Sequence, residues 1–478
     1  MKNPMQRDKL ILAIVIIVAL ITRLFMLTAR PMDHDESIHA YLSYVLLRDH
    51  AYRYDPAFHG PFLYFATAGL FGIFGDSEFV ARLTPVIFSL IAVTVAFKFK
   101  RWIGGSAYIF TFIMLFSPSI LYYSRYARND MILVGSFLAI VYCYFRYLES
   151  KKERFVYLSV LFFTIMICSK ENAYIYLFIF ASFLVLHGLF SEGFEYLKAK
   201  ILKWDKRKIR IVLISSAIFL TMFTSLYSAG FSDWAGLERA TVGALKHWFM
   251  MHASRDHWKP IYYYSLLLLW YEFMPLTLAI ISIPEFIDRL EVKKLTKFEL
   301  FTLYWLLMTL IAYHVLSHKV PWLLVHIATP MALFGCLYMD DLDRKITFRN
   351  IRVFRILLAG LMVATLHTSF YVTYVDYNDA VNQMLIYIQV QPSTIELAER
   401  IIYLHEHDHL IVVYEPMNDY WPLPWYLRHY PIPFMSHGNF RAFEYVVTSE
   451  RMIGVVKGEV LGRYEIRPFY YMILVKMH

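Results

Sequence analysis

Long apolar runs separated by short basic loops constrain this chain more than any other feature of its sequence. The runs fall near residues 10–28, 81–97, 105–120, 131–148, 155–169, 173–190, 211–229, 261–282, 299–316, 321–338 and 352–374. A helix needs about 20 apolar residues to cross a bilayer, and a backbone in lipid must satisfy its own hydrogen bonds. The chain is 58% hydrophobic and 18% charged, which is unusual for a soluble domain. We therefore predict a mainly α fold, a polytopic transmembrane helical bundle of about eleven helices.

The positive charges gather in short clusters between the apolar runs. These clusters lie at 2–9, 98–101, 151–154, 198–210, 289–297 and 344–355. If the N-terminus is inside the cell, every cluster falls on the cytoplasmic side, as the positive-inside rule requires. Because these clusters explain the net charge of +9, the charge does not indicate that the protein binds nucleic acid. It also predicts that segment 31–80 lies outside, as a first outer loop.

Hydropathy divides the chain into two predicted domains. Residues 1–374 form the transmembrane domain, in which 61–74 is apolar but too short to span and is expected to lie in the outer interface. After residue 375 the sequence becomes less apolar. Short β-type segments at 410–414, 445–447 and 470–475 follow a helical pattern at 393–403. We predict that 375–478 form a small extracytoplasmic α/β domain.

Ionisable residues crowd the segment that follows the first apolar run. They are Asp33, Asp35, Glu36, His39, Asp55 and His59. Ionisable groups at membrane depth are costly and usually mark a functional site. Acids in an outer loop are more often only solvated charge, so this cluster does not define a site by itself.

Four further loops on the predicted outer side carry complementary chemistry. Their polar residues are Arg125, Arg128, Asn129 and Asp130; Lys170, Glu171 and Asn172; His247, His252, Arg255, Asp256, His257 and Lys259; and His318 and Lys319. Arginine matches phosphate oxygens with a two-pronged fork, lysine supplies a point charge, and a carboxylate within reach can act as a base. Each loop has a structural alternative, such as arginines that snorkel to lipid headgroups. Together they predict a site that moves a group off a phosphate-linked carrier at the outer membrane surface.

Several ordered motifs resemble those of GT-C glycosyltransferases. The motifs are Asp35-Glu36, Phe58-His59-Gly60-Pro61-Phe62-Leu63-Tyr64, Phe74-Gly75 leading into Ala81-Arg82-Leu83-Thr84-Pro85, and Ser124-Arg125-Tyr126-Ala127-Arg128-Asn129-Asp130. They are similar to the dolichyl-phosphate-mannose protein mannosyltransferases and the lipid A aminoarabinose transferases. Three later motifs, at 169–174, 318–323 and 420–428, resemble a prokaryotic, largely archaeal subfamily named for an association with lipid-linked glycan flipping. The chain lacks the Trp-Trp-Asp motif of oligosaccharyltransferases, which disfavours transfer of a whole glycan to asparagine.

The resemblance implies an enzyme of the cell membrane that takes a sugar from a polyprenyl-phosphate donor on the extracytoplasmic side. Asp35 would be the catalytic base and Glu36 its helper, with Asp130 as a further catalytic candidate. The substrate-binding candidates are Arg125, Arg128, Lys170, Lys319, His59 and His318. The acceptor would be a glycan, a protein or a lipid.

Three alternatives stay open at this point. Asp33, Asp35 and His39 form a hypothetical ligand set for a divalent metal, Mg²⁺ or Mn²⁺. The protein could instead be a non-catalytic accessory that binds or helps to flip a polyprenyl-linked glycan in protein glycosylation. A secondary transporter is the weakest alternative, because Glu272 is the one good candidate for a buried midplane acid and no internal repeat is visible.

Overall fold

A computed structural model describes residues 4–195, 204–253, 257–345 and 348–478. Arg255 and Asp256 of the fourth loop lie outside these residues. The helices of the first 375 residues are α1 (Pro4–Leu24), α2 (His34–Asp49), η1 (Pro56–Phe58), α3 (Phe62–Phe74), α4 (Glu78–Ala81), α5 (Leu83–Lys98), α6 (Lys100–Ile103), α7 (Ser106–Phe116), α8 (Pro118–Tyr123), α9 (Asp130–Ser150), α10 (Arg154–Ile167), α11 (Ala173–Glu192), α13 (Lys206–Tyr227), α14 (Ala235–Glu238), η2 (Arg239–Gly243), α15 (Ala244–Ala253), α16 (Tyr263–Tyr271), α17 (Phe273–Glu291), α18 (Lys297–Val315), η3 (Pro321–Leu323), α19 (Leu324–Cys336), α20 (Met339–Lys345), α21 (Phe348–Phe370) and η4 (Tyr371–Val375).

Seven of the predicted spans are confirmed within the described residues, and an eighth is confirmed if a bent pair of helices counts as one span. Seven helical stretches are long and apolar enough to cross a membrane, and the pair α16 and α17, bent by 98° at Glu272, makes an eighth if it counts as one span. The other three predicted spans are also helices but fail on length or charge. α7 has 11 residues and α10 has 14, while α1 carries Arg7, Asp8, Lys9 and Arg23. The bundle therefore combines full-length spans with apolar helices, such as α7 and α10, that are too short to cross a membrane alone.

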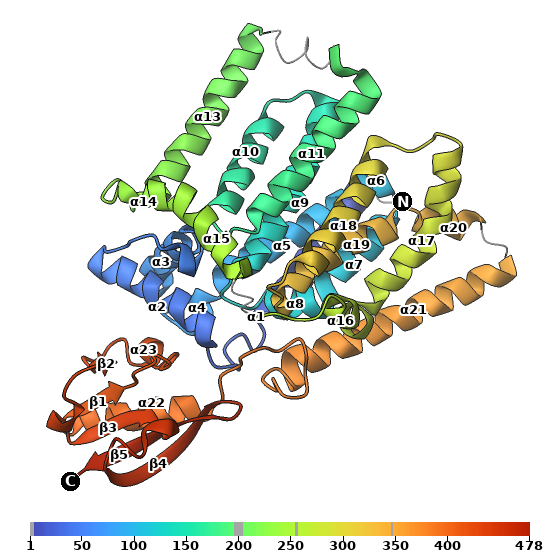
Figure 1. The fold of residues 1–478 in the computed structure, drawn as a ribbon. Helices are drawn as coiled ribbons and strands as arrows, with labels where there is room; N and C mark the ends of the chain where they lie inside the picture. The colour runs from blue at the N-terminus through green and yellow to red at the C-terminus, as the bar shows by residue number, and fades with distance from the viewer. Residues whose placement is uncertain (1–3, 196–203, 254–256, 346–347) are drawn as a thin grey trace.

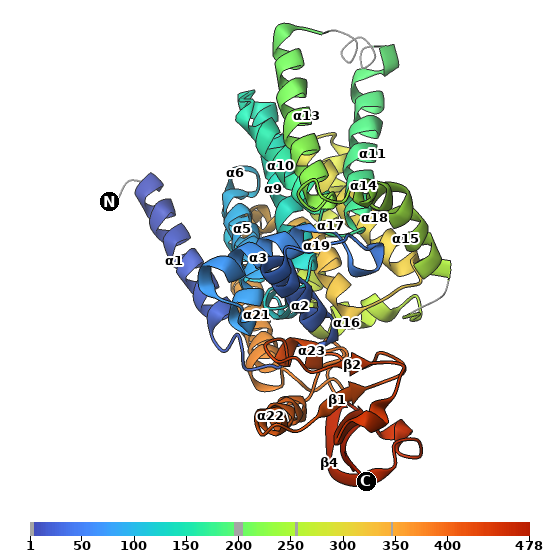
Figure 2. The same ribbon diagram turned by 90° about the vertical axis from the view of Figure 1, so that its left-hand side faces the viewer.

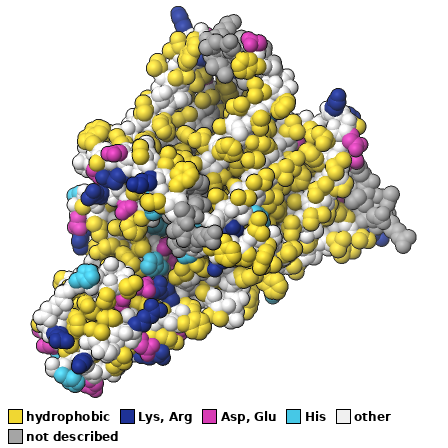
Figure 3. Space-filling model, viewed as in Figure 1, with side chains coloured by type: hydrophobic (Ala, Val, Ile, Leu, Met, Phe, Trp, Pro, Cys, Tyr) yellow, Lys and Arg dark blue, Asp and Glu magenta, His cyan; other side chains and the backbone are white. Residues whose placement is uncertain are grey.

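The most buried spans of the bundle are those that contain α5, α9 and α19, and α9 packs against both of the others. The apolar 18-residue stretch of the span that contains α19 is wholly buried, whereas that of the α13 span has no buried residue, as expected of a helix that faces lipid. Gly135 lets α9 approach α5, because a Cβ there would lie 2.4 Å from the carbonyl oxygen of Phe88. Figure 3 shows hydrophobic side chains covering most of the bundle, while charged side chains gather around the lower left of the view.

The predicted interfacial stretch 61–74 is helix α3, and it packs against α2. α2 begins with a capping box, in which the Asp33 side chain accepts from the backbone N–H of Glu36 and Glu36 accepts from that of Asp33. α3 ends at Gly75, whose φ of +84° suits a residue without a Cβ. With α2, η1, α3 and the start of α4, segment 31–80 is mostly helical rather than an extended loop.

The C-terminal residues form a five-stranded mixed sheet with the order β2-β1-β3-β5-β4. Its strands are β1 (Ile411–Tyr414), β2 (Phe434–Met435), β3 (Tyr445–Ser449), β4 (Gly458–Arg467) and β5 (Tyr470–Met477), with α22 (Ser393–Glu406) and α23 (Leu423–Tyr426) beside them. β1 runs parallel to β2 and β3, and β5 runs antiparallel to β3 and β4. The predicted helix and three strands are confirmed. β4 was missed because four of its ten residues are charged and two are glycine, so it shows no clear β-type run.

This sheet docks against one end of the bundle, which we call the site end (Figures 1 and 2). Arg428 bonds the Asp76 carboxylate at 2.8 Å, and the ring of Trp425 stacks on Phe71 with centroids 5.9 Å apart. The Met32 backbone N–H donates to the hydroxyl of Tyr426 at 3.0 Å. The sheet is thus fixed directly to the segment around α2 and α3.

Candidate active site

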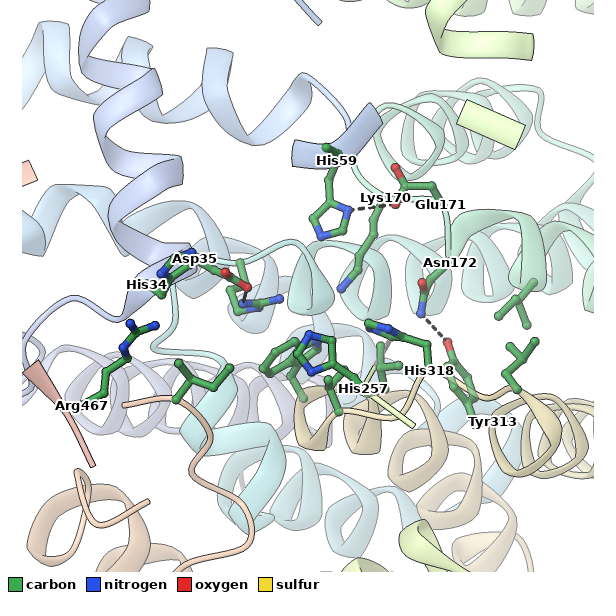
Figure 4. Close-up of a pocket in the computed structure, with 18 residues that line it drawn as sticks. His34, Asp35, His59, Lys170, Glu171, Asn172, His257, Tyr313, His318 and Arg467 are labelled. Carbon is green, nitrogen blue, oxygen red and sulfur yellow. Dashed lines mark hydrogen bonds and ion pairs between the residues drawn. The ribbon is translucent and has the colours of Figure 1, made fainter. Parts of the chain in front are cut away.

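A cavity of about 390 Å³ opens at the site end, where the bundle meets the C-terminal sheet (Figure 4). Its charged and polar lining residues are His34, Asp35, His59, Arg128, Lys170, Glu171, Asn172, His257, Tyr313, His318 and Arg467. Two carboxylates, three cations and four histidines therefore face one space. The residues come from segments spread between α2 and β4, so the fold, not local sequence, assembles the cavity.

The N-terminus of α2 presents Asp35 to the cavity. Arg128 pairs with the Asp35 carboxylate, whose side chain is 38% exposed. Burial alone would raise the pKa of Asp35, but the positive charge of Arg128 outweighs it and holds that pKa well below its usual range. Asp35 is therefore ionised over the physiological range and paired with a cation that also faces the cavity.

Glu36 is the neighbour of Asp35 but does not line the cavity. Arg82 binds both its oxygens at 3.0 Å, Arg30 lies 3.0 Å from one of them, and the backbone N–H of Ala127 donates at 2.7 Å. Burial favours the neutral acid, but Arg30 and Arg82 lower the pKa of Glu36 to about 2. Glu36 thus ties the start of α2 to the 125–129 loop, which makes it a positioning residue.

Arg128 links Asp35 to a second, buried carboxylate. Its guanidinium carbon lies 3.6 Å from the ring centre of Trp322, and its Nε lies 3.8 Å from Asp130 Oδ2. Neither that Nε nor Asp130 Oδ2 has a hydrogen-bond partner among the described residues. The arginine is held flat by stacking while hydrogen-bonding capacity remains on its guanidinium.

Asp130 lies behind the cavity wall and holds Lys170 in place. Lys170 Nζ bonds Asp130 Oδ1 at 2.9 Å, and His326 Nε2 approaches the same oxygen at 3.2 Å. Burial lowers the pKa of Lys170, and the charge of Asp130 only partly offsets it. Lys170 lines the cavity, as predicted for a phosphate-binding cation, whereas Asp130 does not.

His59 and Glu171 form a hydrogen-bonded pair beside Lys170 (Figure 4). His59 Nδ1 lies 2.9 Å from Glu171 Oε2, and Figure 4 shows the imidazole turned into the cavity. The next residue must be glycine, because a Cβ on Gly60 would lie 2.3 Å from the carbonyl oxygen of Cys168. This close approach, with the Gly60 N–H bonded to the Ser169 carbonyl at 2.9 Å, places the two loops side by side.

His318, also predicted, lines the cavity beside His257, with ring centroids 5.1 Å apart. Arg467, at the end of β4, was not foreseen and faces the cavity from the sheet. It bonds Asp419 at 2.5 Å. Nothing in the sequence marks Arg467, since its approach to α2 depends on how the sheet docks.

Two predicted substrate-binding cations do not reach the cavity. The guanidinium of Arg125 bonds the carbonyl oxygens of Thr22, Arg23, Phe25 and Met26, at 2.6–3.1 Å, and so caps the C-terminal end of α1. The Lys319 ammonium folds back onto the carbonyl of Leu316, and its residue is only 3% exposed.

The geometry also argues against the hypothetical metal set. The Asp33 carboxylate caps α2, accepting the N–H of Glu36 at 2.6 Å, and His39 Nδ1 bonds the Ala127 carbonyl at 2.8 Å. Across residues 4–195, 204–253, 257–345 and 348–478, no three His, Cys, Asp or Glu side chains are placed to hold a metal ion. Asp33 and His39 therefore serve the local structure of α2.

Comparison with known proteins identifies the architecture as a GT-C fold. The profile of the dolichyl-phosphate-mannose-protein mannosyltransferase family matches residues 58–203. The structure of ArnT from Cupriavidus metallidurans bound to undecaprenyl phosphate aligns with a TM-score of 0.68 and 14% identity, covering 99% of this chain and 98% of that one. Its apo structure aligns with a TM-score of 0.64 and 14% identity, covering 97% of each chain.

A third structural match is more distant. The S. cerevisiae protein O-mannosyltransferase Pmt1-Pmt2 complex aligns over 48% of this chain and 34% of that one, with 19% identity and a TM-score of 0.38. No curated protein sequence matches the chain. The recognition of a GT-C glycosyltransferase type from the sequence motifs is confirmed, since the chain resembles both the mannosyltransferases and the aminoarabinose transferases. The structural matches show the fold, and the comparisons do not single out the largely archaeal subfamily.

Proposed function

We propose that this protein transfers a sugar from a polyprenyl-phosphate donor to an acceptor hydroxyl on the extracytoplasmic side of the cell membrane. The single observation that carries the proposal is the Asp35–Arg128 pair at the cavity, backed by Lys170. It combines a carboxylate suited to accept a proton with two cations suited to hold a phosphate. The fold it shares with ArnT, whose structure holds undecaprenyl phosphate, supports this class of donor.

In the proposed reaction the acceptor oxygen attacks the anomeric carbon of the sugar. The bond between that carbon and the phosphate oxygen breaks, and its electron pair leaves with the polyprenyl phosphate. The acceptor proton passes to Asp35, while Arg128 and Lys170 stabilise the charge on the departing phosphate. Stabilisation by one such donor is typically worth on the order of a hundredfold in rate.

Arg128 gives the site a means to activate its base. A carboxylate paired with a guanidinium is a weak base, because the ion pair favours its ionised form. A donor phosphate competes for the same guanidinium, and as Arg128 shifts toward it the Asp35 carboxylate regains basicity. Donor binding and base activation are thereby coupled through one side chain.

His59 is the alternative base. Its pairing with Glu171 at 2.9 Å orients the imidazole toward the cavity, an arrangement in which a carboxylate stabilises a histidine that takes up a proton. His59→Gln distinguishes the two. With Asp35 as base, the variant keeps most of its turnover and changes substrate affinity; with His59 as base, it loses turnover as fully as Asp35→Asn.

We infer that the sheet region 375–478 forms a separate domain that selects the acceptor. Arg467 supports this role, since it brings a cation from β4 to the cavity wall opposite α10 and α11. Its partner Asp419 keeps the guanidinium in place. An acceptor with an anionic group would pair with Arg467, and Arg467→Gln would then raise the KM for the acceptor more than that for the donor.

The proposal is tested with purified protein in lipid, a panel of polyprenyl-phosphate sugars and a membrane extract as acceptor. Release of polyprenyl phosphate with one donor, together with a glycosylated product, supports transfer. Binding of donors without release from any of them would contradict it and would favour an accessory that carries the lipid-linked glycan.

A further inference from the structure

A second hollow, of about 640 Å³, lies on the bundle at the end opposite the candidate active site. Its floor is α5, and α1 lies on one side of it and α10 on the other (Figure 2). The apolar lining comes from Ile16, Ile87, Leu90, Ile91, Val95, Ala139, Cys143, Leu158 and Phe162. We call this hollow the α5 groove. Apolar side chains of this kind provide the contacts that the acyl chain of a lipid makes in a bilayer.

Three cations close one end of the α5 groove, and none of the side chains that line it is acidic. Lys98 ends α5, Arg146 lies in the last turns of α9, and Arg154 begins α10. Neither Lys98 nor Arg154 has an ion-pair partner among the described residues. Arg146 bonds Glu149 at 2.9 Å through Nη1, but its buried Nε has no partner among them. The end of the groove therefore gathers three cations, of which only Arg146 has a carboxylate partner among the described residues.

Four other cations at this end of the bundle form ion pairs within the protein. Lys100 bonds Asp8 at 2.7 Å, and Arg101 bonds Glu149 at 2.5 Å. Arg207 and Arg210 both pair with Glu153, at 3.1 and 2.5 Å. Lys98 and Arg154 differ from these four cations, because neither has a carboxylate partner among the described residues.

We propose that the α5 groove binds an anionic phospholipid, with its phosphate among Lys98, Arg146 and Arg154 and an acyl chain along α5. The charge pattern of the sequence predicts that this end faces the cytoplasm, where anionic lipids are concentrated. Basic pockets between membrane helices on that side bind such headgroups. A zwitterionic lipid fills the same apolar space but leaves a positive charge excess at the groove end.

The test uses the full chain in detergent and native mass spectrometry with phosphatidylglycerol or phosphatidylcholine of equal acyl length. The wild type is expected to retain one phosphatidylglycerol at least about tenfold more tightly than phosphatidylcholine. Each basic residue near an anionic headgroup is worth about fivefold, so K98Q/R146Q/R154Q should weaken phosphatidylglycerol on the order of a hundredfold. Equal retention of the two lipids by the wild type would overturn the proposal.

A matched control removes the same charge elsewhere at this end. Lys152, Lys293 and Lys294 are exposed and do not line the groove. The K152Q/K293Q/K294Q variant should change phosphatidylglycerol binding less than about threefold, and a loss equal to that of the groove variant would refute a specific site.

A second variant keeps every cation and tests the apolar half of the groove. Leu158 is 40% exposed, so Leu158→Trp fills the groove while leaving the bundle core intact. The variant should retain less phosphatidylglycerol, and unchanged retention would refute the acyl-chain part of the proposal. Inorganic phosphate at 10 mM, roughly a physiological level, should not displace the lipid; displacement would identify a site for free phosphate instead.

Discussion

Glu36→Gln should destabilise the protein more than any single change at the cavity surface. The substitution keeps the size of the side chain but removes the charge that compensates Arg30 and Arg82, both almost fully buried. Removing one partner from a buried ionic cluster typically costs about 3–5 kcal/mol. The pKa of about 2, against an ordinary value of 4.5, gives a similar figure of about 3 kcal/mol.

The pH dependence follows from the same pKa. Because folding lowers the pKa of Glu36, its contribution is complete above pH 4.5 and is lost as the pH falls from 4.5 to about 2. The assay is the unfolding midpoint in detergent, followed by tryptophan fluorescence, for wild type and variant between pH 7 and pH 3, roughly the range over which a carboxylate of this kind titrates. The unfolding midpoint of the variant should be lower than that of the wild type at pH 7 and should fall less as the pH is lowered. An unchanged midpoint at pH 7 would refute the view that Glu36 is the structural tie between α2 and the 125–129 loop.

Three further outcomes follow from the geometry. Arg125→Gln should lower the unfolding midpoint, because it uncaps α1, while leaving the KM for the donor within about twofold; a large rise in KM would restore Arg125 to the binding site. Lys170→Gln should weaken donor binding on the order of tenfold or more, whereas Lys319→Gln should change it little, as measured by titration with a polyprenyl phosphate; the reverse order would contradict the assignment of the cavity. Burial lowers the pKa of His39 to about 4, so folding stability is lost as the pH falls from 6.5 to about 4. In His39→Gln the unfolding midpoint should depend less on pH over that range; an unchanged pH dependence would refute the role of His39.

The helical architecture was predictable because membrane spans carry their signal in composition. Apolar length is a local property of the sequence, and the seven confirmed spans, with the bent pair as an eighth, follow from it. β4 shows the limit of this reasoning. Its four charged residues and two glycines interrupt any alternating apolar pattern, and its backbone partners come from β5.

The candidate site was predictable in its chemistry but not in the use of each residue. Asp35, Arg128 and Lys170 were identified from loops predicted to share a side of the membrane, and they line one cavity. Arg125 occupies the same loop as Arg128 but points to the carbonyls at the end of α1. Sequence distinguishes arginine from lysine, yet the choice between capping a helix and facing a cavity depends on which backbone passes nearby. The position of Arg467 was equally unpredictable from sequence, because it reaches the cavity only through the docking of the sheet.

The base assignment of Asp35 is the central claim, and one comparison tests it most directly. Purified wild type and Asp35→Asn are given the donor that the wild type uses, and the release of polyprenyl phosphate and the binding of donor are both measured. We expect release to fall on the order of a hundredfold or more. Donor should bind at least as tightly, because Arg128 loses its internal partner and is free to hold the phosphate. Equal release from both proteins would contradict the account and remove Asp35 from the reaction.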